Sequence, residues 1–558
     1  MDSYNFLSSL DSHPDSPNGK HLGRVIGGSL KGGVDVKLDH NISVEDIQVG
    51  RYVVLEGQRL KFFGMVTDVE LATLNPEMAS ITPNIDDPFI AEVVAGTATY
   101  GTIHVLPSLA LAVHGVLGNA APEPVKTVPT HFALAKEATE ADVAAVFGEE
   151  GGSNFWVGDP LEMEAKVCIN LEELVKRSNG IFGKSGTGKT FLTRILLAGI
   201  IQKDAAVALI FDMHNEHGWQ GTSEGQDSRS VKGLKQVLGS KVSLFTLDED
   251  SSKKRRVSTD YVVRIGYNEI TPEDILLLRE PLSITERGMD AVAELAGCYS
   301  DSKWLDATLK LSAAELRDDL KDKNIDIPIG TLRALKTSLA RLKRFDFMEP
   351  EEHGGAVERI LEYLGRGTSV VLEFGRYAND STAQILVANI LSRRIHERYV
   401  EWTERALGEG GSEPQPLVIV IEEAHKFLNS EVADQTIFGT IAREMRKYNV
   451  TLLVVDQRPS GISDEVMSQI GTRLCCLLDN DRDVDSVLTG VAGRSELREV
   501  LAHLDSKQQA LIFGHAVPMP VVIKVREYGT PESYAQLGGS SASSASEYQR
   551  MQREMYGD

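Results

Sequence analysis

Residues 183–190 carry the clearest chemical pattern in the chain and read Gly-Lys-Ser-Gly-Thr-Gly-Lys-Thr. This is the G-x-x-x-x-G-K-[ST] pattern of a P-loop, and it lies between the short apolar segment 179–182 and a helix-like apolar run. Glycines let the backbone of such a loop turn tightly and approach phosphate oxygens, and the helix that follows points free N–H groups at the same phosphates. The pattern therefore predicts binding of a nucleoside triphosphate, with ATP as the expected cofactor.

The last two residues of the loop have separate expected roles. Lys189 can reach the β- and γ-phosphates, and the hydroxyl of Thr190 can ligate Mg²⁺. We therefore expect ATP and Mg²⁺ to be bound together. The residues predicted to bind the nucleotide are those of the loop and the one that follows it: Gly183, Lys184, Ser185, Gly186, Thr187, Gly188, Lys189, Thr190 and Phe191.

A pair of acids follows the apolar run 417–421, which ends directly in Glu422 and Glu423. A buried strand at this place would put the first carboxylate, Glu422, in the Mg²⁺ shell. Glu423 would then orient and polarise the attacking water. The alternative is two solvated glutamates at a strand end, but the P-loop upstream favours the catalytic interpretation.

Three further segments supply candidate side chains. Gln457 follows another apolar run, where an amide beside the γ-phosphate can respond to the presence of that phosphate. Arg443 and Arg446 are three residues apart and share one face of a predicted helix. Either arginine could act as a finger on the ATP of a neighbouring subunit, or both could belong to an ordinary solvated helix end. Asp212 and Glu216, which follow a third apolar run, are candidates of second rank.

Strands must position these side chains, and apolar runs alternate with helical patterns from about residue 155 onward. Continuous apolar runs of this kind indicate a parallel sheet covered on both faces by helices, which is an α/β fold. Residues 271–364 interrupt the alternation with charged, helix-periodic sequence, so a helical insertion is predicted there. The apolar runs lie at residues 181–182, 206–211, 369–374, 417–421, 451–455 and 473–478.

The region before the α/β pattern has closely spaced β-branched runs punctuated by glycine, which predict a small β-barrel. The Pro-rich stretch 122–129 predicts a linker that leaves this barrel. The expected strands of the barrel lie at residues 23–28, 34–38, 49–55, 62–69 and 90–98. The predicted domains are a disordered N-terminus (1–20), the barrel (21–150), the first part of the core (151–270), the insertion (271–364), the second part of the core (365–530) and a tail (531–558).

Composition narrows the class of protein. The chain has 558 residues, enough for two to four domains, and its four cysteines lack metal-site spacing. No stretch has the length and apolarity of a membrane span, and the N-terminus lacks a signal-peptide pattern, so a cytoplasmic protein without a membrane partner is expected. The net charge of −23 argues against wrapping nucleic acid over the outer surface, although a locally basic channel remains compatible with it. The basic residues considered for DNA contact, which solvated loops explain equally well, are 253–256, Lys336, Arg341, Lys343 and Arg344.

The motifs, in this order and spacing, resemble the HerA family of hexameric DNA translocases, which is related to the FtsK-like branch of RecA-type motors. The resemblance covers roughly residues 21–528 and implies a RecA-like P-loop core preceded by the HAS barrel of that family. It also implies a ring of six subunits, ATP sites at the subunit interfaces and double-stranded DNA in a central pore. Besides the P-loop, the matching segments are Asp-x-His-x-Glu at 212–216, Glu-Glu-Ala-His at 422–425, the arginine-bearing helix at 443–448 and Gln-Arg-Pro-Ser at 457–460.

Two residues depart from the patterns of related ATPases. Glu422 stands where many P-loop ATPases have aspartate, and Met445 stands where a glycine usually precedes the arginine. By analogy with the FtsK-like branch, Arg446 is preferred to Arg443 as the finger. The resemblance further implies a partner that docks on the barrel, either a NurA-like nuclease in DNA end processing or a sirtuin-like or nuclease effector in antiphage defence.

Two functions fit these features. The first is an ATP-driven DNA translocase or helicase, an enzyme. The second is an ATP-binding hexameric scaffold that assembles and regulates an effector without obligatory translocation. A metabolic P-loop kinase fits poorly, because nothing in the sequence resembles a lid for a small substrate and the barrel would have no role.

Overall fold

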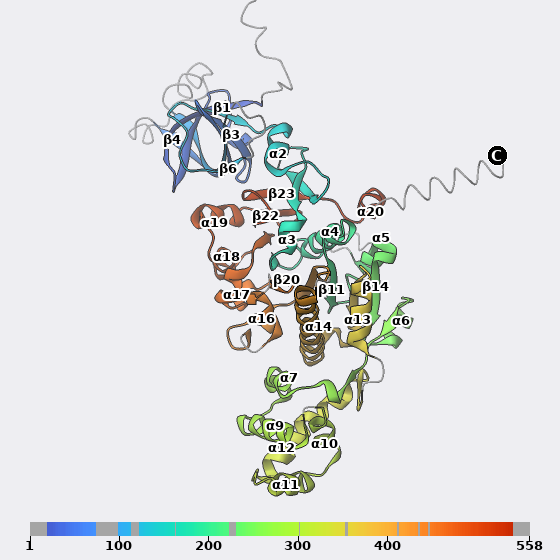
Figure 1. The fold of residues 1–558 in the computed structure, drawn as a ribbon. Helices are drawn as coiled ribbons and strands as arrows, with labels where there is room; N and C mark the ends of the chain where they lie inside the picture. Colours follow the sequence, from blue (N-terminus) through green and yellow to red (C-terminus); the bar gives the residue numbers. More distant parts are fainter. Residues whose placement is uncertain are drawn as a thin grey trace, which may run out of the picture. The chain divides into compact units, whose positions relative to one another are not determined.

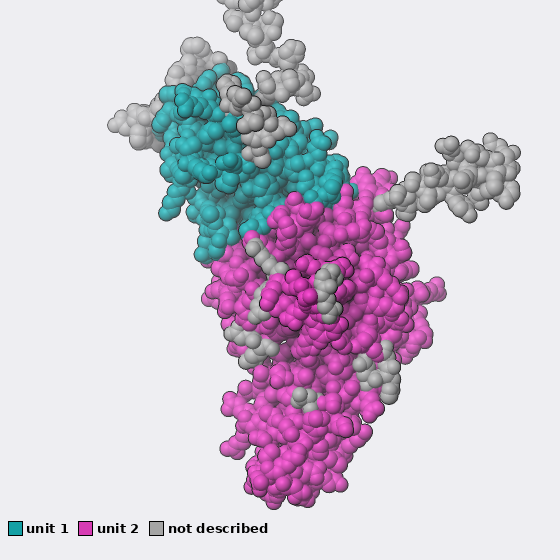
Figure 2. Space-filling model, viewed as in Figure 1, with its two compact units in different colours: residues 1–169, 474–479, 490–526 teal, residues 170–473, 480–489, 527–558 magenta. Residues whose placement is uncertain are grey.

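The computed structural model describes residues 19–73, 99–112, 122–161, 163–222, 230–300, 302–351, 355–409, 412–433, 436–444 and 447–538. Figure 1 shows the helices and strands along the chain. The chain divides into two compact units, which Figure 2 colours separately. Unit 1 comprises residues 1–169, 474–479 and 490–526, and unit 2 comprises residues 170–473, 480–489 and 527–558.

Unit 1 begins with an antiparallel β-barrel, as the sequence predicts. β2 (Gly33–Leu38) pairs with β1 (His21–Ser29) on one side and with β5 (Thr99–Ala112) on the other, so the sheet closes on itself. Inward-facing residues of these strands bury a continuous apolar core. The predicted strand at residues 90–98 lies outside the described residues. The other long strands of the barrel are β3 (Tyr52–Glu56), β4 (Leu60–Thr73) and β7 (Leu134–Glu137).

The interpretation of residues 122–129 as a linker that leaves the barrel is wrong. β6 (Glu123–Pro124) pairs with β5, and the chain then continues to β7, which lies between β1 and β3. Pro124 lies in β6, an edge strand, where a missing N–H costs no ladder hydrogen bond. The chain therefore leaves the barrel only after residue 137, and α2 (Glu140–Phe147) follows.

Unit 1 also contains an antiparallel group of strands drawn from both ends of the chain. β23 (Val521–Val525) pairs with β22 (Gln509–Gly514) and with β8 (Asn154–Pro160). Gly50 of the barrel lies so close to β23 that a Cβ atom would be 2.9 Å from the Val522 side chain. The barrel therefore packs directly on a strand from the opposite end of the sequence.

Unit 2 is built on a parallel sheet, which confirms the predicted α/β core. The strands run in the order β14 (Val242–Thr246), β18 (Ser369–Glu373), β11 (Val207–Asp212), β19 (Leu417–Glu422), β20 (Val450–Asp456) and β10 (Asn179–Phe182). Every residue of these six strands is buried, as a sheet covered on both faces requires. β14 is the one of the six that the sequence did not predict. The run at 473–478 begins as β21 (Thr472–Cys475).

The register of the sheet brings the ends of its strands to one edge. Phe182 pairs with Asp456 and Asp212 pairs with Glu373, so β10 ends level with β20 and β11 ends level with β18. Because all these strands are parallel, the residues that follow them gather at the same edge of the sheet. α4 (Lys189–Gln202) follows β10 and packs on β10 and β11, while α13 (Ala356–Gly365) packs on β18.

The helical insertion lies in unit 2 and has its own core around the fully buried Trp304, whose indole N–H donates to the carbonyl of Ile270. Figure 1 shows its helices grouped together, apart from the sheet. Buried polar contacts join it to α14 (Ser381–Glu409), since Asp274 accepts hydrogen bonds from Asn389 and Arg393, both at 2.8 Å. The insertion consists of α7 (Pro272–Leu277), α8 (Arg279–Leu282), α9 (Glu286–Tyr299), α10 (Trp304–Lys310), α11 (Ala313–Asp322) and α12 (Ile329–Leu339).

Among the helices in the described part of the chain, none is both long enough and apolar enough to cross a membrane.

Candidate active site

The P-loop connects β10 to α4 at the edge where the strands end. Gly183, Gly186 and Gly188 have φ angles of 155°, 80° and 98°, which side chains disfavour. Gly188 caps α4 without a side-chain hydrogen bond, and nothing lies within 4 Å of the place where its Cβ would be. The N–H groups of the first turn of α4 are therefore open to a phosphate.

Two side chains of the loop bind the same backbone carbonyl. Nζ of Lys189 and Oγ1 of Thr187 donate to the carbonyl oxygen of Lys184, at 2.8 Å and 2.7 Å. These contacts hold the lysine ammonium group against the loop. The oxygens of a triphosphate carry negative charge, so they would be stronger acceptors for this ammonium group than the carbonyl.

A cavity of about 240 Å³ opens beside the P-loop. Four segments that are far apart in the sequence contribute to it, namely the P-loop with the start of α4, the loop after β11, and the ends of β19 and β20. Gly183, Lys184 and Thr187 belong to the same loop but do not line the cavity. The lining residues are Ser185, Gly186, Gly188, Lys189, Thr190, Phe191, His214, Glu216, Glu422, Glu423, Val455, Asp456 and Gln457.

Glu422 is the last residue of β19, and its side chain is buried against a histidine. Its Oε1 atom lies 3.0 Å from Nε2 of His217, which has no exposed surface. Burial by itself raises the pKa of Glu422, but His217 outweighs the burial and holds this pKa below its ordinary value. Burial likewise opposes protonation of His217, yet Glu422 raises the pKa of the imidazole. The two side chains therefore form a buried carboxylate–imidazolium pair.

The second carboxylate oxygen of Glu422 suits a cation. Within the described residues, Oε2 of Glu422 is buried and has no hydrogen-bond partner. The hydroxyl of Thr190 lines the same cavity. Carboxylate and hydroxyl oxygens are hard ligands of the kind that Mg²⁺ prefers, so the residues present fit a magnesium ion held by Thr190 and Glu422.

Glu423 leaves the sheet in a left-handed backbone conformation, with a φ angle of 52°. Its Oε1 atom accepts a hydrogen bond of 2.7 Å from Nε2 of Gln457. Left-handed residues other than glycine are strained, and such residues gather at functional sites. The tips of β19 and β20 thus present a carboxylate and an amide to the cavity, and together these groups can hold and polarise a water molecule.

A second histidine–carboxylate pair lies next to Glu423. Asp456 ends β20 and is almost fully buried, and it accepts hydrogen bonds from the backbone N–H of His425 at 2.7 Å and from its Nδ1 at 2.9 Å. The hydrogen bond to Asp456 raises the pKa of His425. This pair fixes the chain immediately after Glu423 to the end of the neighbouring strand, so it positions the catalytic candidate.

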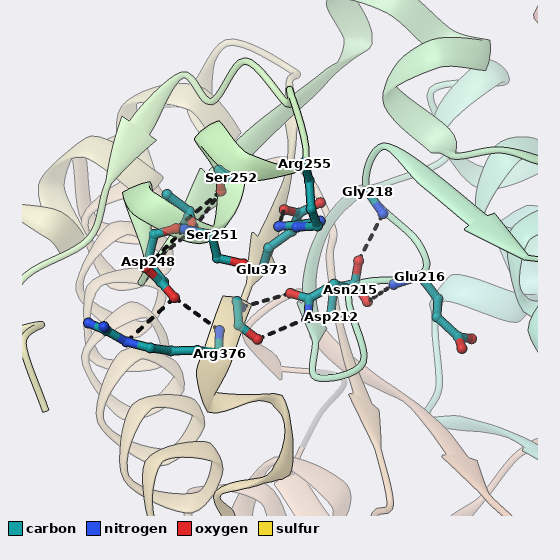
Figure 3. A network of polar contacts seen from close by, with 12 residues as sticks. Asp212, Asn215, Glu216, Gly218, Asp248, Ser251, Ser252, Arg255, Glu373 and Arg376 are labelled. Carbon is teal, nitrogen blue, oxygen red and sulfur yellow. Dashed lines mark hydrogen bonds and ion pairs between the residues drawn. The ribbon is translucent and has the colours of Figure 1, made fainter.

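Asp212 supports the backbone instead of facing the cavity. Its carboxylate accepts hydrogen bonds from the N–H groups of Glu216 at 2.7 Å and of Gly218 at 2.8 Å (Figure 3). It also accepts one from the N–H of His217 at 2.8 Å. This carboxylate therefore shapes the loop after β11. Of the two candidates of second rank, Glu216 therefore lines the cavity and Asp212 does not.

Glu216 lies in the loop after β11, close to Thr190, which is one of the two residues that would hold Mg²⁺. Its Oε2 atom lies 3.5 Å from Oγ1 of Thr190. Burial, followed by the negative charge of Glu422, raises the pKa of Glu216.

Of the two candidate arginines, the structure describes only Arg443. Arg443 lies near the end of α16 (Ile437–Glu444), where its Nη1 atom is 3.8 Å from a carboxylate oxygen of Glu465, and it does not line the cavity. Arg446 lies outside the described residues. The role of either arginine thus stays a prediction.

The basic residues considered for DNA contact bind groups of their own chain. Lys336 and Lys343 donate to backbone carbonyls at the end of α10, and Arg341 donates to the carbonyl of Leu282. In the run 253–256, Lys253 pairs with Glu249 and Arg255 pairs with the buried Glu373. Arg344 pairs with Asp380. These contacts within the chain give most of the basic residues considered for DNA contact a structural role.

Sequence reasoning left His217 and Asp456 without a role. His217 was visible only as one more polar residue after β11, and Asp456 only as the residue before Gln457. The signal that marks them is position, because both residues follow or end an apolar run that becomes a central strand.

Comparison with known proteins agrees with the fold and the motifs. The family model described as "Helicase HerA, central domain" matches residues 155–395, and the model "HAS barrel domain" matches residues 22–108. A protein of Sulfurisphaera tokodaii named DNA double-strand break repair helicase HerA is 23% identical over 547 residues, covering 96% of this chain and 97% of that protein. The protein of the same name from Pyrococcus furiosus is 22% identical over 429 residues, covering 71% of this chain and 74% of that protein.

Among solved structures, the plasmid coupling protein TrwB in complex with an ATP analogue matches with a TM-score of 0.46 and 10% identity, over 71% of this chain and 94% of that chain. The two family models fall on separate parts of the structure, the barrel and the region that contains the P-loop. The chain therefore carries the central domain and the HAS barrel that these HerA-type models describe, and it is an ATP-hydrolysing enzyme of the helicase and translocase class.

Proposed function

We propose that the protein is a hexameric, ATP-driven translocase that moves along double-stranded DNA. Relatives that match nearly the whole chain are named DNA double-strand break repair helicases, which supports DNA as the substrate. The closed barrel and the helical insertion add surfaces that ATP hydrolysis alone does not require.

The observation that carries the proposal is the charge of the cavity. Among the described residues that line it, Lys189 is the only lysine or arginine, whereas Glu216, Glu422, Glu423 and Asp456 are acids. Transfer of a phosphoryl group develops negative charge that P-loop enzymes neutralise with a metal ion and an arginine. An arginine from a neighbouring subunit would complete this site, and sites shared between subunits imply a ring.

Within one subunit, each side chain then has a defined task. The open N–H groups at the start of α4 and the ammonium group of Lys189 hold the β- and γ-phosphates. Mg²⁺ held by Thr190 and Glu422 would neutralise the charge of the phosphate oxygens. Glu423 accepts a proton from the attacking water, which Gln457 helps to orient, and the products are ADP and inorganic phosphate.

Mixing two inactive variants tests whether the sites are shared. Lys189→Ala removes the phosphate lysine, and Arg446→Ala removes the preferred finger, with Arg443→Ala prepared in parallel. In a mixed ring, some sites combine an intact Lys189 from one subunit with an intact arginine from the next, so phosphate release should recover. No recovery in mixed rings of either pair would overturn the shared site.

DNA dependence separates the motor from the scaffold. A translocase should hydrolyse ATP faster when duplex DNA is added, and Lys189→Ala should abolish both the basal and the stimulated rate. A rate that duplex DNA does not change, together with ATP-dependent capture of an effector, would support the scaffold instead.

We also propose that the barrel docks a partner, either a NurA-like nuclease in end processing or a sirtuin-like or nuclease effector in antiphage defence. Support comes from the match of residues 22–108 to the HAS barrel model. Deletion of residues 1–137 should abolish co-purification of that partner and leave ATP binding to the P-loop intact. Retention of the partner by the deleted chain would contradict this docking role.

A further inference from the structure

A two-sided hydrogen bond joins the loop after β11 to the residues that follow β18. Oδ1 of Asn215 accepts from the N–H of Gly375 at 2.8 Å, and Nδ2 of Asn215 donates to the carbonyl of Gly375 at 3.2 Å. Both residues are left-handed, with φ angles of 57° and 58°. Figure 3 shows Asn215 between the Asp212 loop and the residues around Arg376. We refer to this pair of hydrogen bonds as the Asn215 clamp.

On one side, the clamp is rigidly connected to the cavity. Asn215 directly precedes Glu216, whose carboxylate lines the cavity 3.5 Å from the hydroxyl of Thr190. The three N–H groups bound by the Asp212 carboxylate hold residues 216–218 as one unit. A displacement of Glu216 would therefore move Asn215 as well.

On its other side, the Asn215 clamp is connected to the residues that follow α12, the last helix of the insertion. The residue after Gly375, Arg376, donates its N–H to Asp248 at 3.1 Å, and its guanidinium group pairs with Asp346. The N–H of Asp346 donates in turn to the hydroxyl of Tyr377 at 3.0 Å.

Further contacts hold the same two segments together. The ring of Tyr377 packs edge-on against Phe345 and Phe347, with centroid distances of 5.7 Å and 5.0 Å. Arg344 pairs with Asp380 at 2.8 Å. Residues 344–347, which come after α12 in the chain, are thus held against residues 375–380.

We propose that Asn215 is a positioning residue that couples nucleotide occupancy of the cavity to the position of the helical insertion. The proposal rests on ATP and Mg²⁺ binding at the P-loop. A Mg²⁺ ion would take the hydroxyl of Thr190 from Glu216, and the negative charge of the triphosphate would repel the Glu216 carboxylate. The loop then shifts, and the Asn215 clamp carries that shift to Gly375 and onward to Asp346. Because a ligand shifts a conformational equilibrium only by its differential affinity for the two states, this repulsion supplies the required difference.

A substitution that preserves the backbone isolates the clamp. Asn215→Gly removes both hydrogen bonds and tolerates the left-handed conformation. Asn215→Asp keeps the acceptor for the Gly375 N–H, loses the donor and places a negative charge beside the Gly375 carbonyl. Asn324 is a matched control, because it is also left-handed, with a φ angle of 61°, and its side chain is exposed on the insertion.

The experiment is hydrogen–deuterium exchange on the full chain, with and without ATPγS and Mg²⁺, read from peptides that cover residues 340–350 and 375–380. Nucleotide affinity is measured in parallel with a fluorescent ATP analogue. In the wild type and in Asn324→Gly, nucleotide should change exchange in both peptides. In Asn215→Gly, the change at 340–350 should fall by more than half while the dissociation constant moves less than about threefold, and Asn215→Asp should lie between them.

Two results overturn the coupling. One is an undiminished nucleotide-linked change at 340–350 in Asn215→Gly, which would make the clamp a purely structural contact. The other is a wild type that binds nucleotide but shows no change at 340–350. Failure of the wild type to bind nucleotide at all would refute the proposed function itself. If Asn215→Gly fails to fold, Asn215→Asp decides by the same comparison.

Discussion

Replacement of Glu423 by glutamine is the perturbation that most cleanly separates chemistry from binding. The introduced amide would retain an Oε1 atom for the side chain of Gln457, so the 2.7 Å hydrogen bond between the two strand tips is kept. The carboxylate of Glu423 is 19% exposed and lies 3.7 Å from Nε2 of His425, so its loss leaves no fully buried charge unpaired. The free energy of unfolding should therefore change by no more than about 0.5 kcal/mol.

The effect on the reaction should be much larger. A general base or water-orienting carboxylate typically contributes 10²- to 10⁴-fold to the rate, on the order of 3 to 5 kcal/mol of the activation free energy. We therefore expect the kcat of Glu423→Gln to fall at least about 100-fold while nucleotide affinity stays within about threefold, because the P-loop is untouched. Phosphate release and titration of a fluorescent ATP analogue measure the two quantities.

Glu431 supplies a matched control for the change at Glu423. Glu431→Gln makes the same change at an exposed acid that does not line the cavity, and it should leave kcat unchanged. A folded Glu423→Gln protein with a kcat within tenfold of the wild type would show that Glu423 is not the water-activating group.

The remaining predictions concern binding and stability. Lys189→Ala should weaken binding of the ATP analogue at least about tenfold, because it removes the only lysine among the described lining residues, and unchanged affinity would contradict its role. His217→Ala should lower the free energy of unfolding by about 3–5 kcal/mol in chemical denaturation, because it leaves the buried Glu422 carboxylate unpaired; a loss below about 1 kcal/mol would refute the ion pair. The contribution of His425 to stability should be complete below its unfolded pKa of 6.5, because Asp456 raises the folded pKa, and it should be lost as pH rises through that folded value. Denaturation of wild type and His425→Gln from pH 5.5 to 9 should show a stability difference that narrows as pH rises, and a widening difference would contradict the pairing.

The central strands and the P-loop could be predicted from the sequence because each is a local pattern. A run such as 417–421 is apolar on both faces, as a covered parallel strand requires, and such a strand brings the residues after it to a known edge of the sheet. The same logic predicts that Glu422, Glu423 and Gln457 meet at one edge of the sheet. β14 was not predicted because Val242–Thr246 contains Ser243 and Thr246, which interrupt the apolar run although both are buried.

The pairings inside the site could not be predicted, because they depend on which strands are neighbours. His217 and Glu422 are 205 residues apart and meet only because β11 lies beside β19 in the sheet. Similarly, Asp212 resembles a catalytic acid in the sequence, yet three backbone N–H groups occupy its carboxylate. The linker predicted at 122–129 was wrong because proline indicates a break in a strand but does not indicate whether the chain leaves the sheet.

Displacement of the third strand from a DNA triplex tests the central claim most directly, because it reports movement along an intact duplex and not hydrolysis alone. The wild type with ATP and Mg²⁺ should displace the third strand, whereas the wild type with ATPγS and the Glu423→Gln protein with ATP should not. A wild-type protein that hydrolyses ATP in the presence of the duplex but leaves the triplex intact would contradict a DNA translocase.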